Sequence, residues 1–187
     1  MKLKNFALAV GLAVAGFSAQ ALDITSTVAL LGDPHVAQSA VLSAAGGSQI
    51  NHQISGAFSD TFTFNFAGTG LVDVIIYNTA ARGDLANQQI VFSSANLNGV
   101  ALTIDVDETD SATIYRSAAL FQAPAHGNLV LTINGYAGLL GSTQPGISAS
   151  YAGSLNVTAV PEPSSYALLA AGLLVLGVVA RRKRSAV

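Results

Sequence analysis

The stretch GAFSDTFTFNFAG, residues 56–68, is the part of the sequence that best indicates the fold. In a β-strand, successive side chains point to opposite faces. As a strand, this stretch puts one carboxylate among four phenylalanines on a single face: Phe58, Asp60, Phe62, Phe64 and Phe66. The opposite face is polar: Ser59, Thr61, Thr63 and Asn65. The pattern predicts a strand with one buried face, and it leaves the partner of Asp60 to be explained.

Alternating apolar residues recur along the chain in short runs separated by turn residues. Asn98-Gly99 is the strongest hairpin signal, because both residues tolerate positive φ. A segment from Val36 to Ala45 is predicted as a helical turn that ends at Gly46-Gly47. Many short strands about ten residues apart predict an all-β fold, an antiparallel β-sandwich or jelly-roll-like single domain. The expected strands are 24–31, 58–66, 72–76, 90–94, 100–106, 112–120, 129–133 and 151–157.

Asp60 needs a partner, because an unpaired buried charge costs several kcal/mol. On a structural interpretation, its carboxylate accepts backbone N–H groups from a neighbouring turn or pairs with Arg82 or Arg116. On a functional interpretation, it is a calcium or sugar ligand at the rim of the sheet.

The charge of the central region limits its partners. Of the eight basic residues, only Arg82 and Arg116 lie between residues 22 and 160, against nine acids, a formal charge of −7. Such a region offers no electrostatic footprint for nucleic acid. The chain has no cysteine, so no disulfide supports the fold.

The N-terminal end has the three parts of a secretory signal peptide. Lys2 and Lys4 precede an apolar run over 6–17, and Ala19-Gln20-Ala21 supplies a small-x-small cleavage site. We therefore predict a signal peptide over residues 1–21, removed after Ala21, with an uncleaved anchor as the alternative.

The C-terminal end also has three parts. A motif is followed by an apolar run over 166–180 and then by a basic cluster. The run of about 15 residues would make a helix of about 23 Å, short against a hydrocarbon core of about 30 Å. We predict a transmembrane helix whose basic stop remains cytoplasmic, which places the domain over 22–159 outside the inner membrane. The motif is Pro161, Glu162 and Pro163, and the basic stop is Arg181, Arg182, Lys183 and Arg184.

This tail, over 160–187, resembles the PEP-CTERM sorting signal of Gram-negative bacteria. The resemblance implies recognition by an exosortase, a transient inner-membrane anchor, and a final place at the cell surface or in an exopolysaccharide or biofilm matrix. A permanent tail anchor is the alternative. Phe58-Ser59-Asp60-Thr61-Phe62 resembles the signature of the FxDxF subfamily, in which Phe58, Asp60 and Phe62 would be structural residues.

The remaining sequence offers little support for catalysis. His35, His52 and His126 are expected to be lone loop histidines without metal-ligand spacing. The acidic run over 105–110 departs from the EF-hand pattern and is expected to be a solvated hairpin loop, with calcium as the alternative. We expect no catalytic, cofactor or metal site, and an exported surface or matrix protein that is not an enzyme. The alternatives are a secreted hydrolase and a carbohydrate-binding module that uses exposed Tyr77, Tyr115, Tyr136 or Tyr151.

Overall fold

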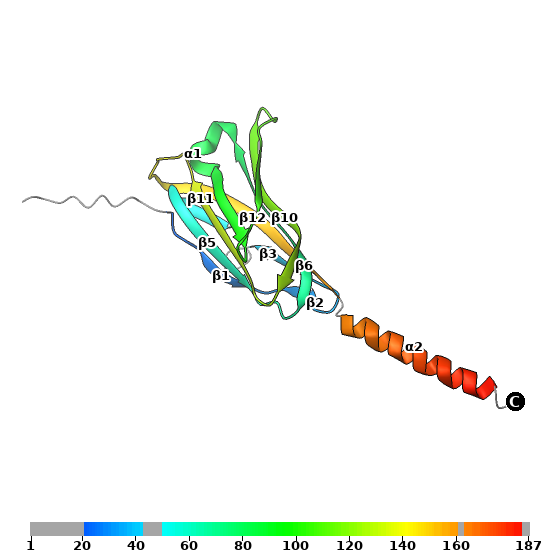
Figure 1. Ribbon diagram of the computed structural model, residues 1–187. Helices are drawn as coiled ribbons and strands as arrows, with labels where there is room; N and C mark the ends of the chain where they lie inside the picture. Colours follow the sequence, from blue (N-terminus) through cyan, green and yellow to red (C-terminus); the bar gives the residue numbers. More distant parts are fainter. Residues whose placement is uncertain (1–20, 43–49, 161–162, 185–187) are drawn as a thin grey trace, which may run out of the picture.

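The computed structural model describes residues 21–42, 50–160 and 163–184. Two β-sheets form the main body, and the last helix runs away from them (Figure 1). The all-β prediction is confirmed. The other elements are a 3-10 helix and two α-helices: η1 (Arg82–Asp84), α1 (Leu85–Gln88) and α2 (Pro163–Arg184).

The smaller sheet contains five strands in the order β1-β5-β11-β7-β8. Among the described strand pairs, β1 with β5 is parallel and the others are antiparallel. The strand predicted from the phenylalanine stripe is the second of this sheet. Its members are β1 (Thr25–Val28), β5 (Gly56–Phe64), β11 (Leu129–Ala137), β7 (Ile90–Leu97) and β8 (Val100–Ala101).

The larger sheet contains seven strands in the order β2-β3-β12-β6-β10-β9, with β4 also paired to β12. Its long central strands alternate between buried and more exposed side chains, so that one face covers the first sheet. The members are β2 (Leu31–Asp33), β3 (Ala37–Leu42), β12 (Pro145–Ala159), β6 (Thr69–Ala81), β10 (Thr113–His126), β9 (Thr103–Asp107) and β4 (Ile50–Ile54).

The two sheets share one hydrophobic core. Phe62 and Leu131 of the smaller sheet and Leu155 of the larger one are fully buried in the same cluster. The phenylalanine stripe faces this core as the alternation predicts, with Phe58 4 % and Phe64 0 % exposed. The sequence pattern therefore gave the correct face of β5.

Three of the predicted elements are different in the structure. The expected strand over 24–31 is divided into β1 and the start of β2. Residues 37–42 form strand β3 rather than a helical turn, because they pair with β12; residues 43–49 lie outside the described part. The run over 100–106 is divided between β8 and β9, and only Leu102 of its apolar residues is buried. Ile104 and Val106 are exposed, and β9 lies at the edge of the larger sheet, where β10 is its one partner among the described strands. The Asn98-Gly99 hairpin is confirmed, with φ of 49° and 84°.

Candidate functional site

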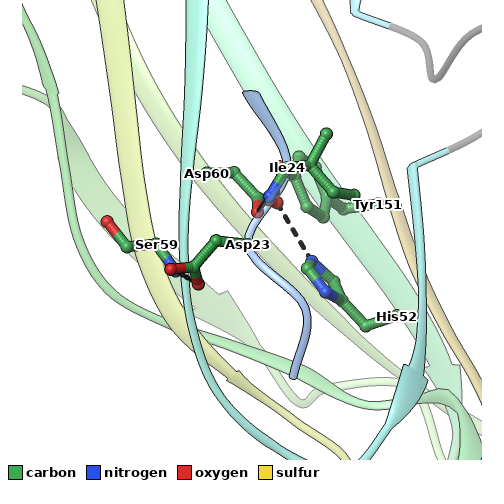
Figure 2. A network of polar contacts seen from close by, with 6 residues as sticks. All are labelled: Asp23, Ile24, His52, Ser59, Asp60 and Tyr151. Carbon is green, nitrogen blue, oxygen red and sulfur yellow. Dashed lines mark hydrogen bonds and ion pairs between the residues drawn. The ribbon is translucent and has the colours of Figure 1, made fainter. Parts of the chain in front are cut away.

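Asp60 of β5 lies at the centre of a buried polar network that joins the two sheets (Figure 2). One carboxylate oxygen accepts the backbone N–H of Ile24 at 2.8 Å. The other is 3.0 Å from Nε2 of His52 on β4 and accepts the hydroxyl of Tyr151 on β12 at 2.5 Å. Three donors therefore satisfy a carboxylate that has no exposed surface.

The protonation of this network follows from its geometry. Tyr151 is 1 % exposed, and its burial, followed by the nearby Asp60 carboxylate, raises the pKa of its phenol well above the ordinary value. Tyr151 is therefore a neutral donor at physiological pH. The tautomer with its proton on Nε2 allows His52 to donate to the same Asp60 oxygen.

Aromatic rings enclose the network. The ring of His52 stacks on Phe58 at a centroid distance of 4.2 Å, and Phe92 meets Tyr151 edge-on at 5.8 Å. Both polar rings are buried, so neither presents a reactive atom to solvent. Donors that converge on Asp60 would also repel a cation. This arrangement supports the structural interpretation of Asp60 rather than the calcium-ligand interpretation.

The network differs from the expectation in its partners. A backbone N–H does bind Asp60, but the side chain that pairs with it is His52, not an arginine. Arg82 instead donates to the carbonyls of Glu108 and Asp110, and Arg116 lies 4.0 Å from Glu108. The arginine prediction was wrong because both arginines serve the β9–β10 hairpin.

Three further predictions were wrong. His126 is the last residue of strand β10 rather than a loop residue. His52 is a buried strand residue rather than a loop residue, and Tyr151 is buried rather than exposed. The sequence contains a signal for the burial of His52 and of Tyr151. Ile50 is two residues from His52, and Leu155 is four residues from Tyr151, so the strand period puts each pair on one face, and that face is the core.

The other tyrosines lie outside this network. Tyr77 and Tyr115 are 41 % and 36 % exposed on neighbouring strands, with ring centroids 6.0 Å apart. Tyr136 is half-buried and donates its hydroxyl to the carbonyl of Ser142. Two of the four proposed platform residues thus meet on one face of the larger sheet.

The acidic run lies at the β9–β10 hairpin and is exposed throughout. Its first residues belong to β9 and the rest form the connection. Asp107 accepts the backbone N–H and the hydroxyl of Thr109, which hold the pKa of its carboxyl below the ordinary value. Asp110 accepts the N–H of Ala112, with the same effect on its pKa. Within the described ranges, no cluster of three or more potential ligands could hold a metal ion.

Because these carboxylates serve local turns, millimolar calcium is expected to leave the melting temperature of the protein nearly unchanged. A specific site, with ligand at 100 times its dissociation constant, would add about 2.7 kcal/mol to the free energy of unfolding. Calorimetric melts with and without calcium measure the difference. A saturable rise that Asp107→Asn abolishes would contradict this prediction.

The C-terminal segment is a helix with exposed apolar side chains. Proline suits the first turn of a helix, and α2 begins at Pro163. Leu168, Leu173 and Leu174 are between 61 % and 73 % exposed. Pro161 and Glu162 lie outside the described residues, as does Ala19 of the predicted cleavage site, and the basic residues 181–184 form the last turn of α2.

The predicted transmembrane character of this helix is not confirmed. In the described part of the chain, no helix is both long enough and apolar enough to cross a membrane.

The identity of the tail comes from comparison with known families. Residues 159–184 match the PEP-CTERM protein-sorting motif. The chain carries a PEP-CTERM sorting tail. No curated protein and no solved structure matches the chain. The motif is that of exported proteins that an exosortase processes, which agrees with the resemblance found in the sequence.

Proposed function

We propose that this chain is a non-enzymatic surface or extracellular-matrix protein, exported behind a cleaved signal peptide and sorted by an exosortase through its PEP-CTERM tail. In this proposal α2 holds an inner-membrane intermediate, and the released β domain joins an exopolysaccharide or biofilm matrix. The observation that carries the proposal is the match of residues 159–184 to the sorting motif, next to an all-β domain.

The junction between domain and tail supports processing at the motif. The last interactions of the larger sheet are made by Ala159, whose N–H donates to Val36, and by Val160, whose N–H donates to Thr69. Both residues precede Pro161. A cut at or after the motif would therefore leave every one of these hydrogen bonds in place, and it would remove a helix whose described side chains, Tyr166 to Leu176, are exposed.

The burial of Ala21 restricts when the signal peptide can be removed. Ala21 is 2 % exposed, and Asp23 and Ile24 are bound to β5 through Ser59 and Asp60. A peptidase needs an extended, accessible segment. In the proposed order of events, cleavage after Ala21 precedes the docking of this segment on β5.

The tail is tested by changing Pro161, Glu162 and Pro163 to alanines. In cells that contain the exosortase, we expect the parent chain to appear at the surface or in the medium without residues 166–187, because the protease reads the motif. The variant should stay as the longer form in the inner-membrane fraction, as should the parent chain in cells lacking the exosortase. Intact-mass measurement of each fraction identifies the form.

Leu140→Ala, in an exposed loop of the domain, is the matched control and should be processed like the parent. Full-length protein that ends at Val187 on the surface of normal cells would defeat the sorting proposal and leave a permanent tail anchor.

A carbohydrate-binding module is the second candidate for the β domain. It is favoured by the exposed, stacked pair Tyr77 and Tyr115.

A further inference from the structure

A groove crosses the outer face of the larger sheet beside the tyrosine pair. It has a volume of about 690 Å³ and lies over β9, β10 and β6. Tyr115 and Phe121 supply aromatic surface, Ile75 gives an apolar floor, and Asp105 and Ser117 give polar atoms. The strand register places Asp105, Ser117 and Tyr77 in one row across the three strands. The groove therefore alternates flat apolar surface with hydrogen-bonding groups.

One side of the groove is formed by a bulge in β10. The register with β6 shifts between Leu120 and Ala123, and Gln122 adopts a φ of 54°, which is rare for a residue other than glycine. Asp73 holds this conformation by accepting the Gln122 N–H at 2.7 Å and its side-chain amide at 3.2 Å. The bulge leaves Phe121 66 % exposed. Bulges beside functional sites commonly re-aim a side chain in this way.

Neither the exposure of Phe121 nor the positive φ of Gln122 stabilises the hydrophobic core. A phenylalanine directed to solvent forgoes its burial, and a positive φ at glutamine adds backbone strain. Exposed apolar groups gathered beside polar ones are typical of a ligand site.

The charges of this face restrict the ligand. Asp105 lies in the groove, and Asp107 is two residues along the same exposed strand. The only two bases between residues 22 and 160, Arg82 and Arg116, are engaged with the hairpin at Glu108. An anionic chain would be repelled, and so would the acidic face of a second copy. A neutral, hydroxyl-rich chain is compatible, since its hydroxyls donate to Asp105 and its C–H faces pack on the rings.

We propose that this groove binds a neutral polysaccharide chain, with Tyr115 and Phe121 as packing surfaces, Tyr77 stacked beside Tyr115 at its margin, and Asp105 as a hydrogen-bond acceptor. The inference deepens the second candidate function and rests on it. It names the site and the ligand class.

The test is affinity electrophoresis of the full-length chain in mild detergent through gels that contain dextran, laminarin, galactomannan or hydroxyethyl cellulose. Alginate serves as the anionic comparison. We expect at least one neutral polysaccharide to slow the protein saturably and alginate to have no effect. Tyr115→Ala and Phe121→Ala should each raise the dissociation constant about tenfold, as is usual for an aromatic anchor.

Leu140→Ala, which removes an exposed apolar side chain that does not line the groove, should bind like the parent. Melting temperatures establish that each variant is folded, and Phe121 is exposed enough for its substitution to report alone if Tyr115→Ala fails to fold. The proposal is overturned if no neutral polysaccharide slows migration, if both groove variants bind like the parent, or if only alginate binds. Self-association that Tyr115→Ala abolishes, without polysaccharide binding, would also overturn it. None of these outcomes affects the mass measurement that tests sorting.

Discussion

Asp60→Ala is expected to lower the free energy of unfolding by about 1 to 3 kcal/mol, the usual cost of leaving buried hydrogen-bonding groups without a partner. The substitution leaves the Nε2 proton of His52, the hydroxyl of Tyr151 and the N–H of Ile24 without an acceptor. His52 and Tyr151 are buried, so water cannot replace the carboxylate without opening the core. Thermal and denaturant melts of the full-length chain measure the loss.

Two control variants separate the network from general effects of substitution. Asp60→Asn keeps the volume and one acceptor oxygen but presents an amide donor to other donors, so we expect an intermediate loss. Ser59→Ala alters an exposed side chain on the same strand and should change stability by less than about 0.5 kcal/mol. A melting temperature unchanged by Asp60→Ala would disprove the structural role and return the residue to consideration as a ligand.

The burial of Asp60 could be predicted from the sequence, but its partners could not. Alternation along residues 56–66 is a local property, and it identifies the face of a strand without reference to the rest of the chain. The donors come from Ile24, His52 and Tyr151, which are 36, 8 and 91 residues away. Periodicity does not say which strands meet across a core, so arginines were expected on charge alone.

The same limit applies to the proposed groove. Tyr77 and Tyr115 could be identified as aromatic residues on strands, but their contact depends on the register of β6 with β10. The bulge at Gln122 has no sequence signature of its own, because glutamine does not favour positive φ. The hairpin at Asn98-Gly99 was predictable, since there the local residues determine the backbone.

Tertiary pairing also explains the errors at the sheet edges. Residues 37–42 are not strongly patterned, and only pairing with β12 makes them a strand. The alternation of Ile104 and Val106 resembles that of a half-buried strand, yet β9 has no covering layer. An edge strand and a central strand share the same local pattern, and the difference lies in what covers them.

Gly135→Ala is expected to cost about 1 to 3 kcal/mol of stability, the range found when a methyl group is forced into a packed core. Gly135 of β11 lies directly opposite Phe58 of β5. A Cβ at this position would approach Cζ of Phe58 and the carbonyl oxygen of Val91 to 2.6 Å each. Phe58 is also the ring on which His52 stacks, so a displaced phenyl ring would disturb the Asp60 network. Denaturant melts measure the cost.

Gly83→Ala is the matched control, because its new methyl group would meet no atom within 4 Å. It should be neutral or slightly stabilising, since alanine reduces the freedom of the unfolded chain. A Gly135→Ala variant as stable as the parent would contradict the prediction. Combining it with Phe58→Leu identifies the source of the strain. If Gly135→Ala costs less stability in the Phe58→Leu variant than in the parent, the new methyl group clashes with the phenyl ring. If the cost is the same in both, the methyl group clashes with the backbone carbonyl of Val91, and β7 must shift. In the first case Gly135 provides the space in which Phe58 supports the His52–Asp60 pair.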